Sequence, residues 1–177
     1  TMIYRRLNYA EKTIFHLNKI IKGKNFNVFD LCNYGYWRNY DRDWKQSDFF
    51  NYGKFLDENL KKIPPYKLVK LLDVSNLKIR IGFLSADIHK GHSITYFLKT
   101  IISNYDKKKF EITLILNSPK EDHLTKDFKD LVDQTINICN LDNVTALNRV
   151  RELKLDIMID LMGYTSINRI EMLKNRT

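Results

Sequence analysis

Residues 78–104 read KIRIGFLSADIHKGHSITYFLKTIISN, and this stretch decides the fold. Its first part, 78–87, is a short apolar run with β-branched residues that ends in polar ones, which is typical of a buried strand. From 93 to 104 the apolar residues recur at helical spacing, and Ser93 is a favourable N-cap for a helix. A strand that leads through a short loop into a helix predicts the start of a βαβ unit.

The same alternation continues to the end of the chain. In chain order, the expected strands and helices are 110–116, 122–133, 135–139, 143–154, 156–163 and 166–175. Strands that alternate with helices through short loops predict a parallel sheet wound in right-handed βαβ units, with helices on both faces. The predicted fold class is therefore α/β, with a Rossmann-like parallel sheet lobe.

The N-terminal third of the chain has a different pattern. A first helix, a KGKN break at 22–25 and a second helical stretch have the layout of a helical hairpin. A longer amphipathic helix over 43–63 is expected to stop at Pro64 and Pro65. Residues 8–36 also match the last part of a helical-repeat array.

These patterns divide the chain into three parts. We expect a small all-helical segment over 1–63, a linker over 64–75, and the Rossmann-like lobe over 76–177. At 177 residues the chain is long enough for one domain with a core and part of another. Its 44% hydrophobic and 29% charged residues are typical of a globular protein, so we expect it to fold.

The net charge of +9 does not by itself indicate a nucleic-acid partner. The lysines are scattered, and the run KKK at 107–109 falls in an expected turn, where solvated charge is the ordinary finding. No apolar run reaches the roughly 20 residues of a membrane span, and the first residues lack the apolar core of a signal peptide. We expect no nucleic-acid partner, no membrane association and a cytoplasmic location.

The cysteines and glycines indicate no bound group. Cys32 and Cys139 lie far apart, in no CxxC or Cys/His spacing, so neither a zinc site nor a disulfide is indicated and buried free thiols are expected. The chain also lacks the GxGxxG and GxxxxGK[ST] patterns of dinucleotide and P-loop phosphate sites. We therefore expect no metal and no cofactor.

Two of the four histidines follow the first expected strand. In open parallel sheets, ligands bind beyond the carboxyl ends of the strands, where helix N-termini direct free amides. Asp87 ends this strand, His89 and His92 lie in the loop, and Ser93 starts the helix. The helix dipole disfavours a charged histidine at this place, which suits a general base. The alternative is a plain turn, with His89 solvated and His92 packed on the neighbouring turn.

The last expected strand carries a second polar loop to the same edge. Its candidates are Asp160, Gly163, Tyr164 and Thr165. Gly163 permits a positive φ angle or a close backbone approach, and Tyr164 is a candidate for ligand contact. An ordinary strand-to-helix turn remains the alternative.

Aromatic residues gather in the helical segment. They are Tyr34, Tyr36, Trp37, Tyr40 and Trp44. We favour a hydrophobic seam between helices over a recognition surface.

In combination, these motifs resemble a known family. RIGFLSAD, a histidine-bearing loop, HSITYFL, FEITLIL and LDIMIDLMGYTSINRIEML follow one another as in the N-terminal half of the catalytic region of the O-GlcNAc transferase/SPINDLY-like family. The upstream NYDRDWKQSDFFNYGKFLDENL resembles the helix that joins that family's tetratricopeptide array to its catalytic region. The resemblance covers residues 34–177.

The resemblance implies half of a GT-B fold, in which two Rossmann lobes form an inverting, metal-independent glycosyltransferase. Such an enzyme moves a sugar, here N-acetylglucosamine from UDP-N-acetylglucosamine, to a Ser or Thr side chain of an acceptor protein or peptide. The family's first-strand histidine faces the acceptor, which makes His92 and Asp87 the catalytic candidates. The candidates carried over for substrate binding are His89, Asp160, Gly163, Tyr164 and Thr165.

The chain departs from the family pattern in two respects. The family commonly has its histidine four residues after the aspartate, whereas His89 and His92 come two and five residues after Asp87. The chain also stops where the family continues into a second Rossmann lobe, which holds most contacts to the nucleotide diphosphate. We therefore expect one lobe of a larger enzyme, which binds nucleotide sugar through the missing lobe. The alternative is a non-catalytic protein-interaction module or an inactive fragment.

Overall fold

The computed structural model describes residues 9–65, 77–89, 91–165 and 167–174. They pack as two compact units. An α/β unit contains the described residues from 77 to 163, and a helical unit combines residues 9–65 with the segment Tyr164–Lys174. Most of the linker expected at 64–75 lies outside the described residues.

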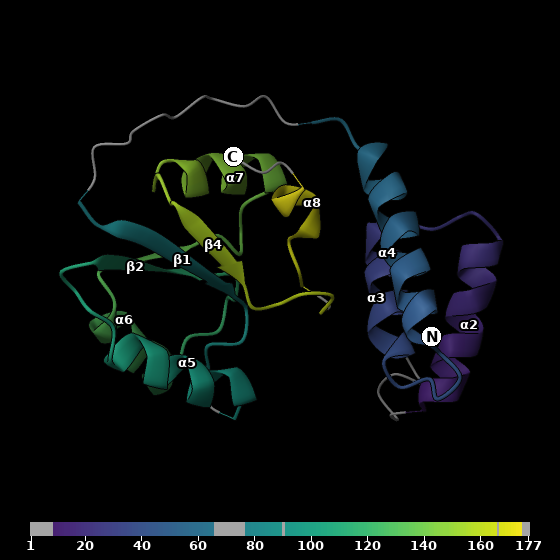
Figure 1. Cartoon of the computed structure of the whole chain (residues 1–177), viewed down its shortest axis with the longest axis horizontal. Coiled ribbons are helices and arrows are strands. Elements are labelled where there is room, and N and C mark those ends of the chain that lie inside the picture. The colour runs from purple at the N-terminus through teal and green to yellow at the C-terminus, as the bar shows by residue number, and fades with distance from the viewer. Residues whose placement is uncertain (1–8, 66–76, 90, 166, 175–177) are drawn as a thin grey trace. The chain divides into compact units, whose positions relative to one another are not determined.

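A four-stranded parallel sheet forms the centre of the α/β unit (Figure 1). The strands are β1 (Ile79–Ser85), β2 (Phe110–Leu116), β3 (Gln134–Asn137) and β4 (Ile157–Asp160). Their order in the sheet is β3-β2-β1-β4, so β1 lies between β2 and β4. Leu84 of β1 pairs with Ile115 on one side and with Asp160 on the other. The expected α/β fold class is confirmed.

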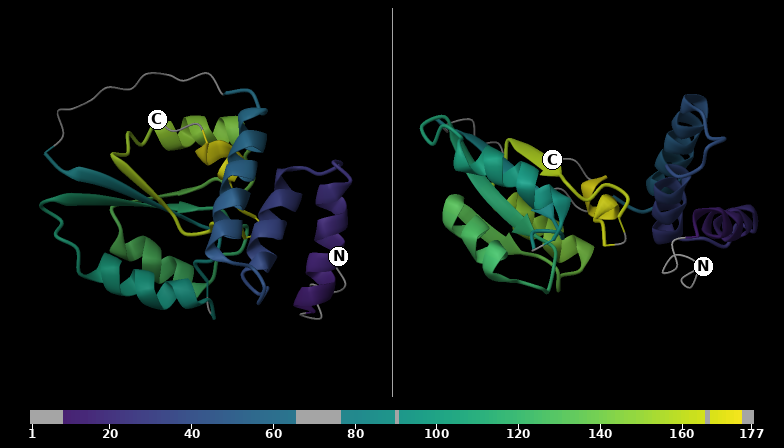
Figure 2. Two further views of the ribbon diagram at one scale, coloured as in Figure 1. Left: turned by 45° about the vertical axis from the view of Figure 1, so that its right-hand side comes forward. Right: turned by 90° about the horizontal axis from the view of Figure 1, so that it is seen from below.

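Helices cover both faces of this sheet. α5 (Ser93–Ser103) and α6 (His123–Leu131) lie side by side on one face, and α7 (Asn143–Arg151) lies on the other (Figures 1 and 2). One buried cluster joins the sheet to α5 and α6; it consists of Phe83, Ile88, Leu98, Ile102, Ile112, Leu114, Leu116 and Phe128. Burying a large apolar side chain contributes about 1.5–3 kcal/mol, so this cluster holds α5 and the loop before it against the sheet.

β4 is less buried than its apolar sequence predicts. The run from 156 to 163 indicates a buried strand, but the side chains of Ile157 and Ile159 are 47% and 36% exposed. β4 pairs with β1 alone among the described strands, so it lies at an edge of the sheet. The expectation of a buried strand is therefore wrong for these two side chains.

Three helices form most of the helical unit. They are α2 (Ala10–Lys22), α3 (Val28–Arg38) and α4 (Gln46–Lys61), and α3 packs against both of the others (Figure 1). Asn27 starts α3 with a capping box, in which its side chain and that of Asp30 each accept the other's backbone amide. None of the helices in the described ranges combines the length and the apolarity that crossing a membrane requires.

The aromatic residues form a seam between these helices. Trp37 is 5% exposed and packs in a cluster with α2. Tyr34 and Trp44 contact each other edge-on and surround Tyr52 of α4. Tyr40 differs, because its side chain is exposed. The seam interpretation is confirmed for Tyr34, Trp37 and Trp44, and Tyr36 packs partly buried against the Trp37 cluster.

The segment after β4 packs with the helical unit. The Tyr164 ring lies edge-on to Tyr52, with 5.9 Å between ring centroids. The Lys174 ammonium donates to the carbonyl oxygens of Leu60 and Ile63, where α4 ends. The sequence pattern assigns this segment to the α/β lobe, whereas its contacts group it with the helices.

The helix expected over 166–175 is shorter in the structure. α8 comprises only Ile170–Leu173. Asn168 forms a turn before it, because its backbone amide and its Nδ2 both donate to the Thr165 carbonyl oxygen, at 3.1 and 2.6 Å. Its Oδ1 accepts from the Ile170 amide at 3.1 Å, so the helix begins only after this turn.

Two helical glycines give a matched test of the packing in the helical unit. A Cβ on Gly35 of α3 would lie 2.5–2.7 Å from the Tyr52 ring, whereas a Cβ on Gly53 of α4 would meet nothing within 4 Å. Overpacking costs about 1–3 kcal/mol, and alanine exceeds glycine in helix propensity by about 1 kcal/mol. Gly35→Ala should therefore lower the free energy of unfolding by about 1 kcal/mol, and Gly53→Ala should raise it by about 1 kcal/mol.

Urea denaturation of both variants measures these changes. The m-value of each variant must match that of the unsubstituted chain, so that a changed midpoint reports stability. Equal stabilisation by the two alanines would show that Tyr52 moves aside freely, against the close packing described above.

The two cysteines differ in exposure, which gives a second prediction. Cys32 is 1% exposed, and burial raises the pKa of its thiol to about 11, although Asn168 Oδ1 accepts from its Sγ at 3.8 Å. Cys139 is only partly buried, so the expectation of two buried thiols holds for Cys32 alone. At mildly alkaline pH we expect a chromogenic disulfide reagent to modify Cys139 in the folded protein and Cys32 only after unfolding.

The variants Cys32→Ser and Cys139→Ser assign the two reactions. The protonated Cys32 thiol stabilises the fold fully below its ordinary pKa of 9.0, and this contribution is lost as the pH rises through about 11. Rapid modification of native Cys139→Ser below that range would contradict the burial of Cys32.

Candidate active site at the carboxyl edge of the sheet

The order of the sheet reverses between β1 and β4. From β1 the chain continues outward to β2 and β3, and it then returns to place β4 on the opposite side of β1. In open α/β sheets, ligands bind beyond the carboxyl ends of the strands at such a reversal. The loops after β1 and β4 start here side by side, with the Leu161 amide donating to the Leu84 carbonyl oxygen at 3.0 Å.

Asp87, His89 and His92 come together in the loop after β1. The Asp87 Oδ1 atom lies 3.9 Å from His89 Nε2, and its Oδ2 lies 3.8 Å from His92 Nε2. The two imidazole rings are 5.9 Å apart between centroids. One carboxylate thus stands between two imidazoles, at distances longer than direct hydrogen bonds. Among the described residues, no group of three His, Cys, Asp or Glu side chains is arranged to hold a metal ion.

His92 has a second role as the N-cap of α5. Its Nδ1 accepts from the Ile94 amide at 3.4 Å, and its carbonyl oxygen accepts from Thr95 Oγ1 at 2.6 Å. Ser93, the N-cap expected from the sequence, is instead the first helical residue. Because a neutral imidazole carries one proton, acceptance at Nδ1 places that proton on Nε2, the atom nearer to Asp87.

Buried neighbours fix the backbone of this loop. Ser85 is fully buried, and its Oγ accepts from the Asp87 amide at 3.1 Å. The His89 amide donates to the Asp87 carbonyl oxygen at 2.9 Å. Ile88 is 2% exposed, and its carbonyl oxygen accepts from Thr125 Oγ1 at 2.7 Å. Neither Ser85 nor Thr125 was predicted from the sequence, and only the place of Ser85 at the strand end signals its role.

Asp160 and Gly163 form a tight turn after β4. The Asp160 carboxylate accepts from the amides of Met162 at 2.9 Å and Gly163 at 3.2 Å. Gly163 has a φ of +53°, the left-handed conformation that favours glycine. Burial raises the pKa of the Asp160 carboxyl, and the two amide hydrogen bonds oppose this shift.

Tyr164 and Thr165 belong to the helical unit. The resemblance assigns both residues to the loop of Asp160 and Gly163, but they pack with the helical unit. Tyr164 contacts Tyr52, and the Thr165 carbonyl oxygen accepts from Asn168. The α/β unit therefore contains five of the seven candidates, of which Asp87, His89 and His92 lie close together, whereas Tyr164 and Thr165 belong to the helical unit.

Asn117 is a further residue of this edge. It directly follows β2, is 5% exposed, and donates its backbone amide to the Ser85 carbonyl oxygen at 2.8 Å. Its Nδ2 lies 3.9 Å from the Met162 sulfur. Asn117 thus links the ends of β1, β2 and β4. Its position at the end of an expected strand was the available sequence signal.

A cleft of about 510 Å³ lies between α5 and α6 next to the loop. Gly91 borders it at the loop, and the side chains of Tyr96, Lys99 and His123 are among those that line it. The exposed rings of Tyr96 and Phe97 lie on α5 itself. The cleft therefore starts at the histidine loop and runs along α5 beside the start of α6.

The parallel sheet, its covering helices and the reversal of strand order define the class: a Rossmann-like α/β lobe. No known family model matches the sequence. The chain is 26% identical over 167 residues to a Solanum lycopersicum protein named "Probable UDP-N-acetylglucosamine–peptide N-acetylglucosaminyltransferase SPINDLY", which covers 92% of this chain and 16% of that protein. An Arabidopsis thaliana protein of the same name is 30% identical over 96 residues, 52% of this chain and 10% of that protein.

A solved structure shows the same fold. It is a mutant of the Thermobaculum terrenum O-GlcNAc transferase, with a TM-score of 0.82 and 20% identity over 94% of this chain and 32% of that chain. The resemblance to the O-GlcNAc transferase/SPINDLY-like family is thus confirmed, in sequence by the curated relatives and in fold by the solved structure. The chain spans only a minor part of the length of each of these proteins.

Asp160 and Asp142 should give opposite pH dependences of stability. Because the pKa of Asp160 is raised, its protonated form stabilises the fold below the ordinary Asp pKa of 3.8, and this contribution is lost as the pH rises through the raised value. Hydrogen bonds from Thr145 lower the pKa of Asp142, so its contribution is present above 3.8 and lost as the pH falls through the lowered value.

Denaturation of the Asp160→Asn and Asp142→Asn variants across the acid range measures both effects. As the pH rises, the unsubstituted protein should lose stability relative to Asp160→Asn and gain stability relative to Asp142→Asn. The same sign for both variants would contradict the burial of the Asp160 carboxyl.

Proposed function

We propose that the α/β unit is the acceptor-side lobe of an inverting glycosyltransferase. The enzyme transfers N-acetylglucosamine from UDP-N-acetylglucosamine to Ser or Thr side chains of an acceptor protein. The observation that carries this proposal is the Asp87–His89–His92 cluster at the reversal point of the sheet. The names of the relatives support the donor and the peptide acceptor. A second lobe supplies most contacts to the donor diphosphate.

In this proposal, His92 accepts the proton of the attacking hydroxyl. Inversion requires a single displacement, in which the acceptor oxygen attacks the sugar carbon as the nucleotide diphosphate leaves. His92 Nδ1 is the basic nitrogen of the neutral ring, and its bond to the Ile94 amide is long, at 3.4 Å. An acceptor hydroxyl competes with that weak bond for the same lone pair.

Asp87 supports this proton transfer electrostatically. Its carboxylate lies 3.8 Å from His92 Nε2, so its negative charge stabilises the imidazolium that forms when Nδ1 takes the proton. The same carboxylate lies 3.9 Å from His89, which keeps His89 as the second candidate for the base. No metal and no cofactor take part in this scheme, and the cytoplasmic location stays a prediction.

The exposed aromatic rings on α5 favour a second candidate function. Tyr96 and Phe97 are 72% and 69% exposed, and adjacent exposed rings are frequent in protein-interaction surfaces. The alternative is therefore a non-catalytic module that binds a protein through α5. It predicts normal partner binding in variants of the histidine loop and no sugar transfer in any of them.

His92→Asn is the sharpest test of the catalytic proposal. Asparagine is a good N-cap, so this variant keeps the start of α5 while it removes the imidazole. In the protein that carries this lobe, turnover should fall about a hundredfold to ten-thousandfold, while donor affinity stays nearly unchanged. His89→Ala, the matched control from the same loop, should lower turnover much less.

Steady-state transfer of labelled N-acetylglucosamine to a Ser/Thr peptide gives the turnover, and calorimetry gives the donor affinity. Equal small effects of the two variants would identify the loop as a structural turn, and a larger loss in His89→Ala would make His89 the base. Parallel assays with GDP-fucose and UDP-glucose decide the sugar. Absence of transfer from all three donors by the unsubstituted protein would leave the interaction module as the function.

A further inference from the structure

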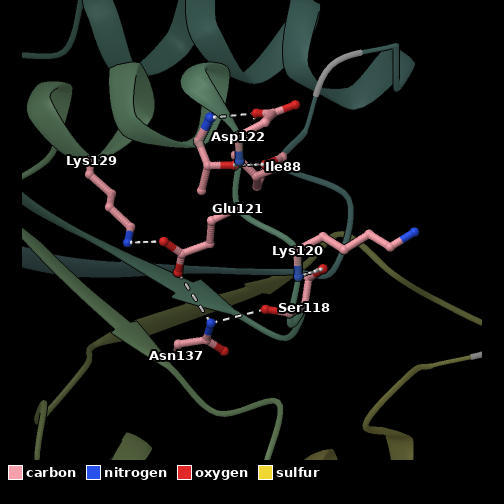
Figure 3. A network of polar contacts seen from close by, with 8 residues as sticks. Ile88, Ser118, Lys120, Glu121, Asp122, Lys129 and Asn137 are labelled. Carbon is pink, nitrogen blue, oxygen red and sulfur yellow. Dashed lines mark hydrogen bonds and ion pairs between the residues drawn. The ribbon is translucent and has the colours of Figure 1, made fainter.

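A buried hydrogen bond ties the histidine loop to α6. Ile88 stands between Asp87 and His89, and its carbonyl oxygen accepts from Thr125 Oγ1 at 2.7 Å. Thr125 is 1% exposed, so water does not replace this bond. Figure 3 shows Ile88 beside Asp122 at the start of α6. The bond joins segments that are 37 residues apart in sequence.

The Thr125 hydroxyl is fully used in this arrangement. A hydroxyl has one proton to donate and can accept at its oxygen. Thr125 Oγ1 accepts from the Asp122 amide at 3.1 Å and donates to Ile88. The Thr125 amide in turn donates to Asp122 Oδ1 at 3.0 Å, which completes a capping box. Asp122 Oδ1, at 3.2 Å, is a second acceptor within reach of the hydroxyl proton, and the shorter distance of 2.7 Å favours the Ile88 carbonyl oxygen.

The start of α6 is itself anchored to the sheet. Glu121 accepts from Lys129 of α6 at 2.6 Å and from Asn137 of β3 at 3.3 Å, and Asn137 also donates to the Ser118 carbonyl oxygen at 2.9 Å (Figure 3). These contacts hold the loop between β2 and α6 against β3. A continuous set of bonds thus runs from β3 through the start of α6 to the Ile88 carbonyl.

We propose that Thr125 is a positioning residue for the histidine loop. Through the Ile88 carbonyl it fixes the backbone that carries Asp87 and His89, and with it the place of the carboxylate beside His92. Its role in transfer rests on the proposed function of this lobe, whereas its effect on the loop does not. Thr125 touches no reacting group, so it acts through Ile88.

The chain offers a matched control for this role. Asp142 and Thr145 repeat the Asp-x-x-Thr cap at the start of α7, with the Thr145 amide and hydroxyl bonded to the Asp142 carboxylate at 3.0 and 2.7 Å. Thr145 is exposed, and both of these bonds stay within its own cap. Thr145→Val therefore removes a hydroxyl at the same helical position without affecting the histidine loop.

The test compares Thr125→Val, Thr125→Ser and Thr145→Val in the protein that carries this lobe. Hydrogen exchange of the amides between residues 86 and 92 should become about tenfold faster in Thr125→Val only, because one buried bond is lost. Turnover should fall about tenfold to a hundredfold in that variant, with the KM for the donor unchanged. Thr125→Ser keeps the hydroxyl and should restore both values.

Equal exchange in Thr125→Val and Thr145→Val would overturn the proposal, as would unchanged turnover in an active Thr125→Val enzyme. If valine prevents folding, Thr125→Ala takes its place, because the smaller side chain lets water reach the Ile88 carbonyl. If the unsubstituted protein transfers no sugar, the proposed function fails, and the exchange rates alone decide whether Thr125 holds the loop.

Discussion

Parallel pairing on both sides of β1 is the constraint on which the α/β unit depends. Each edge of this strand is hydrogen-bonded to a parallel neighbour, so β2 and β4 each fix its direction and register. A Cβ on Gly82, in the middle of the strand, would lie 2.4 Å from Leu155 Cδ1 and 3.0 Å from Ile115 Cδ1. Close packing over β1 therefore leaves little freedom where the strand ends and the polar loop begins, which gives the candidate site a rigid base.

Around the loop after β1, buried residues that anchor the backbone lie next to partly exposed ones. Ser85 and Ile88 are buried and fix the backbone, while Asp87 and His89 between and after them keep their side chains accessible. This grouping could be predicted from the sequence, because parallel strands bring their carboxyl ends to one edge. The additional role of His92 as an N-cap could not be predicted, since the contact of its ring with the Ile94 amide depends on how the loop turns.

Local pattern explains which features were predictable. The four strands follow from short apolar runs and α5 from helical spacing, because burial of one face imposes that spacing on the sequence. The bond from Thr125 to Ile88 leaves no such pattern, since every residue has a carbonyl group and the partners are distant in sequence. The packing of Tyr164 on Tyr52 could not be predicted from the sequence either, because an aromatic residue after a strand does not specify which apolar surface it will cover.

The two edges of the sheet differ in chemical character. At one edge, three of the four residues of β3 are polar, and the Asn137 side chain donates to the Ser118 carbonyl oxygen of the loop beside it. At the other edge, β4 exposes Ile157 and Ile159, and it has no outer neighbour among the described strands. An exposed apolar edge is a template for strand addition from another chain. Self-association and aggregation of this chain are therefore expected to begin at β4, and a lysine at position 157 or 159 would oppose them without disturbing the histidine loop.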